Sequence, residues 1–221
     1  MTRSDRTRRV DTAIRRLYGA TDALRYHNLA HIDFVTKKAV QFAPDLGADA
    51  ELVEAAALTH DVNYLVDPRS SAADGQSLRG QCLAGAGFDA AEIARIEDIV
   101  VTASSEHHGR DLSPEARALA DADMLFKALP STPLLFARDY LEEGQRSILE
   151  IAHELIGRQR PLLSEDRYFY SSSARRDYMG WAETNVRLWE NLVEALQDPD
   201  VAQLVAQRLG REEDPGRQTQ T

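Results

Sequence analysis

The spacing of apolar residues is the feature that most constrains how this chain can fold. In the stretch HNLAHIDFVTKKAVQFA, apolar side chains recur at intervals of three and four residues, at Leu29, Ile32, Val35, Ala39 and Phe42. That spacing places them on one face of an α-helix. Similar spacing returns along the chain, whereas alternating runs of β-branched residues, which are typical of strands, are nearly absent. The sequence therefore predicts an all-α protein.

Further helices are expected wherever this spacing returns between turn-forming segments. DTAIRRLYGA is a short amphipathic segment, DAELVEAAALTHDV follows a capping residue at Asp49, and DAAEIARIEDIVVTAS repeats the pattern. SPEARALADADMLFKAL has Ser113 as its N-cap and Pro114 in its first turn. Longer helices are predicted over residues 132–157 and 174–197.

Three side chains in these longer helices are interpreted as packing residues. Trp181 and Trp189 lie on one helical face and are predicted to pack in the core. His153, in the aliphatic stretch ILEIAHELIG, is interpreted as a histidine of the core or its rim.

Length and composition favour one folded unit. The chain has 221 residues, of which 43% are hydrophobic, and this is enough for one sizeable core. No internal repeat or change of composition marks a second unit, so we expect a single helical domain over residues 1–210. Residues 211–221 are polar, contain glycine and proline and lack apolar anchors, which predicts a disordered tail.

The charge balance argues against general nucleic-acid binding. The chain has 26 lysines and arginines against 36 aspartates and glutamates, and its formal net charge is −10. A surface of that sign repels phosphate backbones unless it carries a strong basic patch. Small molecules are therefore the expected partners.

Cysteine usage and hydropathy indicate the compartment. Cys82 is the only cysteine, so neither an internal disulfide nor a thiolate zinc cluster can form. The sequence contains no apolar run of about 18 residues, and its basic start is not followed by an apolar stretch. We therefore expect a cytoplasmic protein that does not associate with membranes. Its oligomeric state is open, and a homo-oligomer is one option.

Histidines and carboxylates fall on three separate predicted helices. RYHNLAHI carries His27 and His31, which share a helical face because they are four residues apart. ALTHDVNY ends a mostly apolar helix with His60 and Asp61, a costly pair to bury unless it is paired, hydrogen-bonded or bound to a metal. ADADML adds Asp123. Imidazoles and carboxylates are natural ligands of divalent first-row metals, and the ordered set is more specific than a His-Asp doublet alone.

Taken in this order, the motifs resemble those of the HD superfamily of metal-dependent phosphohydrolases, an all-helical family named after its His-Asp doublet. RYHNLAHI, ALTHDVNY, IVVTASSEHHG and ADADML are similar to segments of a subgroup of small predicted HD phosphohydrolases that open with a Tyr-His-Asn…His motif. The resemblance covers roughly residues 20–130, and beyond it only AETNVRLWENLV is similar. It implies a compact multi-helix HD bundle with additional C-terminal helices.

The resemblance also implies a metal site. His31 would be the first ligand, His60 and Asp61 the doublet, and Asp123 the closing carboxylate, which fits the family's Ala-Asp-x-Leu pattern through ADML. Asp121 lies two residues earlier and points to a different side of the helix, as a surface carboxylate or as one that orients a ligand. Such a set suits one divalent transition metal, Mn, Fe, Co, Ni or Zn, and residue identity does not choose among them.

The chemistry implied by the resemblance is hydrolysis by a metal-activated water, with Asp61 as the catalytic residue that ligates the metal and orients the water. Cationic and hydrogen-bonding groups are needed to stabilise charge on the phosphoryl group, and the helix start at RYHN and the loop SSEHHGRD offer them. The alternative for His27 is a donor that orients a ligand, and for the loop histidines it is exposure to solvent. The residues expected to contact substrate are Arg25, His27, Asn28, His107, His108 and Arg110.

The expected function is hydrolysis of a small phosphate ester, with a nucleotide as the favoured substrate. One alternative is a non-catalytic regulatory module that binds a nucleotide or metal. Another is an HD-fold diiron oxygenase, but residues 62–106 contain no histidine for a second iron, so one metal is expected. Some HD nucleotidases carry a glutamate three residues after the doublet's aspartate. This chain has Tyr64 there, so the same proton-transfer scheme is not implied.

Overall fold

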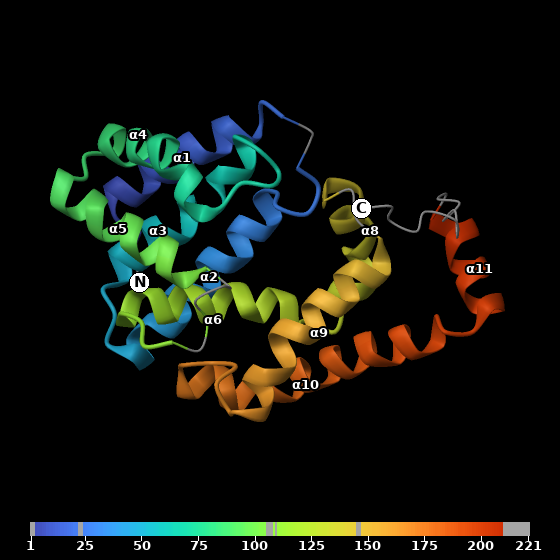
Figure 1. Cartoon of the computed structure of the whole chain (residues 1–221). Helices are drawn as coiled ribbons and strands as arrows, with labels where there is room; N and C mark the ends of the chain where they lie inside the picture. Colours follow the sequence, from blue (N-terminus) through green and yellow to red (C-terminus); the bar gives the residue numbers. More distant parts are fainter. Residues whose placement is uncertain (1–2, 22–23, 105–107, 109, 145–146, 210–221) are drawn as a thin grey trace, which may run out of the picture.

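The computed structural model describes residues 3–21, 24–104, 108, 110–144 and 147–209. Within these residues every regular element is a helix, which confirms the predicted all-α class (Figure 1). The elements are α1 (Asp5–Tyr18), α2 (Leu29–Leu46), α3 (Ala50–Thr59), the 3₁₀ turns η1 (Val62–Leu65) and η2 (Ala72–Gly75), α4 (Gln76–Ala86), α5 (Ala90–Ala103), α6 (Pro114–Ala128), α7 (Thr132–Leu135), α8 (Ala137–Gly144), α9 (Ile148–Ser164), α10 (Ser172–Ala195) and α11 (Pro199–Leu209).

Helix α2 is central to the main core. It packs most extensively on α6 and α3, and α5 covers the other side of α3 and α6. Of the apolar positions predicted to share a face, Ile32, Val35, Ala39 and Phe42 are at most 1% exposed, while Leu29 is half-buried. Helices α1 and α4 pack together and close one end of the bundle, at the top of Figure 1.

The predicted capping residues begin their helices. The Asp49 carboxylate accepts hydrogen bonds from the backbone N–H groups of the first turn of α3, and the Ser113 hydroxyl accepts one from Ala116 in α6. Pro114 occupies the first position of α6, where its missing N–H has no helical partner to lose. The local signals at these helix starts are therefore sufficient to place them.

The predicted helix over 132–157 is wrong, because the chain forms α7, α8 and the start of α9 there. A capping box begins α9: Ser147 accepts a hydrogen bond from the Glu150 backbone N–H, and the Glu150 carboxylate accepts one from the Ser147 N–H at 2.7 Å. These bonds satisfy the first N–H groups of a new helix, so α9 begins here as a separate element.

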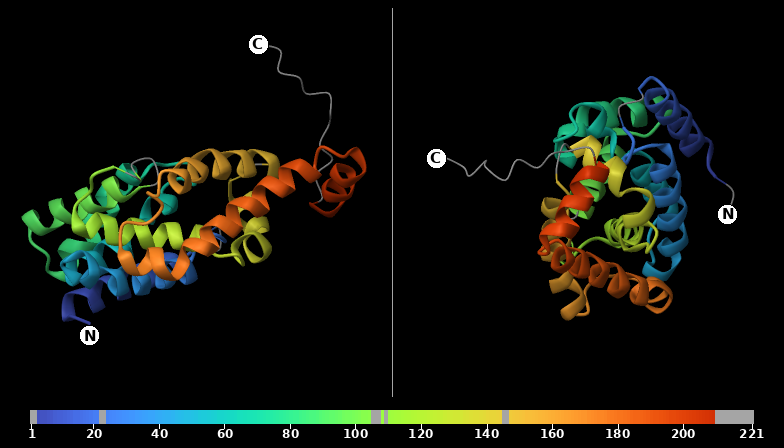
Figure 2. Two further views of the ribbon diagram at one scale, coloured as in Figure 1. Left: turned by 90° about the horizontal axis from the view of Figure 1, so that it is seen from below. Right: turned by 90° about the vertical axis from the view of Figure 1, so that its right-hand side faces the viewer.

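The second long helix is confirmed, since α10 spans most of the predicted range 174–197. Its two tryptophans differ: Trp189 is buried, but Trp181 is 43% exposed, so the predicted core role is wrong for Trp181. His153 is exposed on α9 and is neither a core nor a rim residue. Figure 2 shows α10 along one side of the molecule, with α11, which the sequence did not predict, at its far end.

Two carboxylates from the main core hold the start of α10. Asp121 of α6 accepts hydrogen bonds from the backbone N–H groups of Tyr170 and Ser171, both at 2.7 Å. Asp45 of α2 accepts one from the Ser173 N–H at 2.9 Å and others from neighbouring serine hydroxyls. Negative charge at a helix N-terminus is favourable, so these contacts fasten the C-terminal helices to the core.

A single domain over residues 1–210 stays a prediction, and the predicted tail 211–221 lies outside the described residues. Among the residues that the structure describes, none of the helices combines the length and the apolar character that a membrane span requires.

Candidate metal centre

Three ligand-type atoms converge where the first turn of α2 meets the end of α3. His31 Nε2 lies 3.0 Å from Asp61 Oδ2, and His60 Nε2 lies 3.1 Å from the same oxygen. The two Nε2 atoms are 3.2 Å apart, and all three residues are buried. This His-His-Asp group can hold a metal ion.

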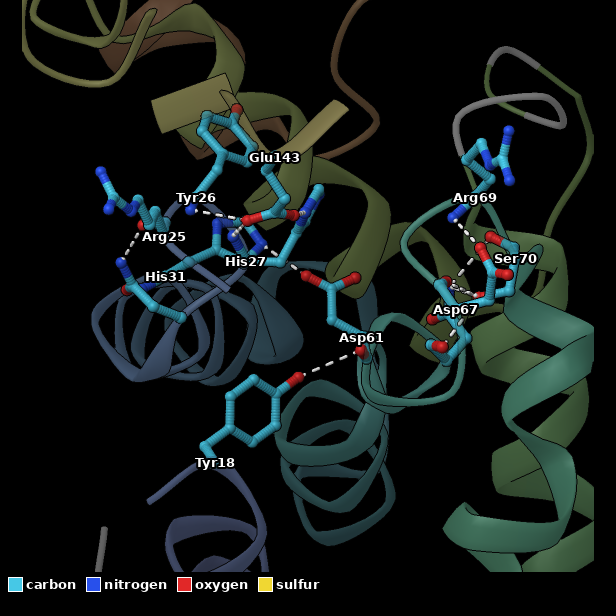
Figure 3. A network of polar contacts seen from close by, with 12 residues as sticks. Tyr18, Arg25, Tyr26, His27, His31, Asp61, Asp67, Arg69, Ser70 and Glu143 are labelled. Atoms are coloured by element: carbon cyan, nitrogen blue, oxygen red, sulfur yellow. Dashed lines mark hydrogen bonds and ion pairs between the residues drawn. The ribbon is translucent and has the colours of Figure 1, made fainter. Parts of the chain in front are cut away.

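Local structure brings these side chains together. The Asn28 carboxamide caps α2 by accepting hydrogen bonds from the Ala30 and His31 N–H groups, which places His31 in the first turn, on the buried face. The buried face of helix α3 is apolar up to its last residue, Thr59, so His60 and Asp61 follow the helix in the interior of the protein. The Tyr18 hydroxyl of α1 donates a hydrogen bond of 3.0 Å to the Asp61 carbonyl oxygen (Figure 3).

The tautomer of His60 suits a metal ligand. Its Nδ1 lies 2.8 Å from the Ala57 carbonyl oxygen, which can only accept, so Nδ1 carries a proton. In the neutral ring the lone pair is then on Nε2, which faces Asp61. Among the described residues, none donates a well-aligned hydrogen bond to Asp61 Oδ2, although this oxygen is buried. A buried oxygen with two imidazole nitrogens around it is a donor set that fits a divalent cation.

The electrostatics of the group are strongly coupled. Burial opposes ionisation of Asp61, but His60 and His31 outweigh burial and hold the pKa of this carboxyl well below its usual value. Burial lowers the pKa of His31, which favours the neutral ring. At His60 the effect of burial is outweighed by attraction to Asp61, so the pKa of His60 is raised. A proton on this ring would therefore compete with a metal ion for Nε2.

Asp123 lies beside this group but has a second partner. Its Oδ1 is 3.7 Å from His31 Nε2, while its Oδ2 accepts a hydrogen bond of 2.6 Å from Lys127 Nζ, one turn later on α6. Lys127 was missed by the sequence reasoning, although an aspartate and a lysine at i and i+4 are a recognisable pair. Asp123 thus lies next to the three converging atoms, and its carboxylate also forms an ion pair with Lys127.

Asp121 points away from the group, as its two-residue offset from Asp123 predicts. It is fully buried, so a surface carboxylate is wrong, and its oxygens hold the start of α10. Burial raises the pKa of Asp121 to about 6. Its contacts are with the backbone of Tyr170 and Ser171 and not with a histidine of the group.

The predicted substrate contacts near the start of α2 separate into two kinds. The Asn28 side chain binds the first N–H groups of α2, which phosphate binding at this helix start would use. Arg25 is exposed and forms an ion pair with Glu142 at 2.6 Å. His27, by contrast, lines the cavity next to the metal group and pairs through Nδ1 with Glu143.

Of the predicted contacts in the loop after α5, the two that the structure describes do not line the cavity. His107 lies outside the described residues. His108 is buried and donates from Nε2 to the Tyr168 carbonyl oxygen at 2.7 Å, and burial lowers the pKa of His108 to about 4. Arg110 is exposed, and its carbonyl oxygen accepts a hydrogen bond from the Tyr170 hydroxyl. Neither His108 nor Arg110 lines the cavity.

A cavity of about 600 Å³ opens beside the metal group. Small apolar side chains from η2 and α5 form one wall, and basic side chains from three separate segments reach it. Sequence reasoning missed these basic side chains and other lining residues, because they come together only in the fold. Among the residues missed are Tyr64, Arg69, Lys127, Glu143, Glu154 and Arg158.

A family model for the HD domain matches residues 28–127. Residues 28–127 are an HD domain. HD domains belong to a superfamily of metal-dependent phosphohydrolases, and the His31, His60 and Asp61 group of this HD domain can hold a metal ion. His27 and Glu143 lie outside it.

The fold as a whole is similar to a crystal structure of a protein from Lactobacillus plantarum, with a TM-score of 0.63 and 17% identity. The similarity covers 93% of this chain and 100% of the other, so the helices around the HD domain are part of the likeness. A comparison with curated proteins found no match.

Proposed function

We propose that this protein is a metal-dependent phosphohydrolase that hydrolyses a small phosphate ester, with a nucleotide as the favoured substrate. The observation that carries the proposal is the convergence of His31 Nε2, His60 Nε2 and Asp61 Oδ2 within 3.2 Å of one another, beside a cavity with basic side chains. Few structural roles would gather two imidazoles and a carboxylate so closely in a core.

One divalent transition metal, Mn, Fe, Co, Ni or Zn, is proposed to be held by His31, His60, Asp61 and Asp123. When bound, it supplies a Lewis acid for a phosphoryl oxygen and lowers the pKa of a bound water. Asp61 Oδ2 faces the two imidazoles, so we assign Asp61 Oδ1 to the orientation of the attacking water. Lys127, bonded to Asp123, brings a positive charge to the same edge of the cavity.

The lining of the cavity supports a phosphate ester with an organic group. Arg69, Lys127 and Arg158 bring positive charge, which favours phosphate oxygens. Two of these cations also pair with carboxylates of the lining, Lys127 with Asp123 and Arg158 with Glu154. The wall of small apolar side chains, which includes Ala72 and Val100, leaves room for a flat organic group such as a nucleobase. Of the predicted substrate contacts that the structure describes, His27 is the one that lines this cavity.

A matrix of metals and substrates tests this function. Mn²⁺, Fe²⁺, Co²⁺, Ni²⁺, Zn²⁺ and Mg²⁺ are each combined with nucleoside monophosphates, diphosphates and cyclic phosphodiesters. Release of phosphate or of the opened ester is expected with at least one transition metal, and Asp61→Ala should abolish it. Asp111→Ala is the matched control, because the Asp111 side chain is 96% exposed and lies outside the cavity.

Metal analysis of the same samples tests whether the protein binds a transition metal, which the proposed function requires. His31→Ala should lose the metal, whereas His27→Ala should retain it. If the reconstituted wild-type protein holds no transition metal, the proposed function is wrong. Tight nucleotide binding with no turnover on any of the metals tested would favour a regulatory module. A content of about two irons per chain would favour an oxygenase.

A further inference from the structure

A turn over residues 67–70, between η1 and η2, forms part of the cavity lining. The Asp67 carboxylate accepts a hydrogen bond of 2.7 Å from the Arg69 backbone N–H, and the Asp67 carbonyl oxygen accepts one of 3.0 Å from the Ser70 N–H. The side-chain amide of the buried Asn63 donates to the Ser70 carbonyl oxygen at 3.1 Å. These bonds hold the main chain at Arg69 and leave its side chain unused.

The guanidinium group of Arg69 differs from the other cations of the cavity, because it has no carboxylate partner. Lys127 pairs with Asp123, and Arg158 pairs with Glu154. No hydrogen bond, ion pair or ring contact joins the Arg69 side chain to another residue in the part of the chain that the structure describes. Arg69 is exposed, so it lies where the cavity opens to solvent and is available to an anionic ligand.

Arg69 is also set apart from the metal group. Figure 3 shows its side chain extending from the turn, to one side of the Asp61 carboxylate, and no ion pair joins these two described residues. A phosphoryl group held by a metal at Asp61 therefore leaves the Arg69 guanidinium for a second anionic group of the same ligand. A guanidinium group suits a phosphoryl group, because its planar fork donates two parallel hydrogen bonds to phosphate oxygens.

We propose that Arg69 binds a second phosphoryl group of the substrate, next in the chain to the one at the metal centre. Arg69 is then a specificity-determining residue that favours a nucleoside diphosphate over the monophosphate. This inference rests on the proposed function for the phosphoryl group at the metal. It adds a substrate class that the metal ligands do not distinguish, because those ligands contact only one end of the ligand.

Arg69→Gln tests the proposal with little risk to the fold, because the Arg69 side chain is exposed and the turn is held by its main chain and by other side chains. Arg187→Gln is the matched control, since Arg187 is exposed on α10 and does not line the cavity. Arg69→Lys keeps the charge but not the planar fork of donors. All three variants should keep the wild-type thermal midpoint and zinc content.

Equilibrium binding measures the contact without turnover. The full chain is loaded with Zn²⁺, freed of excess metal and titrated calorimetrically with two probes. One is α,β-methylene ADP, whose bridging P–C bond is not hydrolysed, and the other is the 5′-methylenephosphonate analogue of AMP. Arg69→Gln should weaken binding of the first probe about 10-fold, as expected when a hydrogen bond to a charged group is lost, and leave the second unchanged. Arg69→Lys should fall in between, and Arg187→Gln should match the wild type.

Several results would overturn the proposal. Equal weakening of both probes would show that Arg69 attracts anions in general, and an unchanged affinity for α,β-methylene ADP, or no binding of it by the wild type, would show that Arg69 contacts no second phosphoryl group.

Kinetics on ADP and AMP give an independent readout. Arg69→Gln should raise KM for ADP about 10-fold, with kcat for ADP and KM for AMP little changed. A wild-type kcat/KM that is higher for AMP than for ADP would contradict the proposal. If the wild type hydrolyses no phosphate ester, the proposed function fails, and the binding comparison still decides whether Arg69 holds a second phosphoryl group.

Discussion

Two carboxylates on α6 illustrate how much the environment of one residue decides. Asp121 and Asp123 are two positions apart, and Asp121 is fully buried while Asp123 lines the cavity. Asp123 lies beside the His31 imidazole and pairs with Lys127, whereas Asp121 holds backbone N–H groups at the start of α10. Because residues two positions apart on a helix point to different sides of it, the same side-chain type lies at the candidate metal centre at one position and holds the fold at the other.

We expect Asp121→Ala to destabilise the fold without removing the metal. The N–H groups of Tyr170 and Ser171 would lose their acceptor, and Ser171 is itself 1% exposed, so the free energy of unfolding should fall by about 2–4 kcal/mol. Urea unfolding measures the loss, and metal analysis of the folded variant should match the wild type. Asp123→Ala should give the reverse result, with lower metal content and a smaller change in stability. Equal metal loss in both variants would contradict this division.

His108 predicts how stability depends on pH. Its folded pKa of about 4 lies below the ordinary histidine value of about 6.5, because burial disfavours the charged ring. The cations Lys127 and Arg167 act in the same direction, while Asp123 opposes them. Between about pH 6.5 and 4 the unfolded chain therefore binds a proton at His108 that the folded chain does not bind. The stability that comes from the neutral, buried ring is present above pH 6.5 and is lost as the pH falls towards 4.

Denaturant titrations between pH 7 and 4.5 should show this loss as about 2 kcal/mol that depends on His108. In His108→Gln this part of the slope should be absent, although the variant is less stable at pH 7. His153→Gln is the control, since His153 is exposed, and it should keep the wild-type slope. An unchanged slope in His108→Gln would show that His108 titrates normally in the folded protein.

At the scale of elements, a single buried arginine joins three segments behind the metal centre. Arg79 of α4 is fully buried and pairs with Glu97 of α5 at 2.7 Å. It also donates to the carbonyl oxygens of Thr59, directly before the His-Asp doublet, and of Ala72 in η2. The end of α3 and the wall of the cavity therefore depend on one guanidinium group.

Arg79→Met should cost about 3–5 kcal/mol of stability, because it leaves Glu97 without its partner in a largely buried position. We also expect weaker metal binding, since Thr59 and the doublet after it lose a contact. Thermal unfolding and metal titration measure the two effects. Arg95→Met is the control, because Arg95 is 62% exposed and 3.8 Å from Glu115, and its effect should stay within about 0.5 kcal/mol.

The elements also show where sequence reasoning succeeds and where it stops. The face of α2 and the inward position of His31 follow from apolar spacing, and the caps at Asp49 and Ser113 are local. The division of 132–157 was missed although its capping box is visible in the sequence as Ser147 and Glu150.

Contacts between distant segments leave no local pattern in the sequence that would predict them. His108 was predicted to face substrate, but the Tyr168 carbonyl that binds it comes from a segment sixty residues later. Glu143 had no recognisable motif at all, because its pairing with His27 depends on the packing of α8 against residues 26–27. Local order is thus readable from one sequence, whereas the partners of a buried polar group are set by tertiary structure.

At the scale of the molecule, the HD domain does not contain its whole core. Val10, Ile14 and Tyr18 of α1 belong to the same buried cluster as α2 and α3, and so do Tyr168 and Phe169 before α10. All five side chains are at most 5% exposed. Because burial of apolar area is the main stabilising term, the segments on both sides of residues 28–127 are needed for the stability of that domain.

Two truncations test this dependence and the predicted single domain. Residues 28–127 alone should not unfold cooperatively and should expose apolar surface to a hydrophobic dye, since the helices that cover their core are removed. Residues 1–198 should keep a cooperative transition and the metal, because none of the residues of α11 whose side chains are described is buried. Calorimetry and metal analysis of both chains are compared with the full protein. A cooperative, metal-binding fragment 28–127 would show that α1 and α10 are accessory to an independent domain, and the single unit over residues 1–210 would then be wrong.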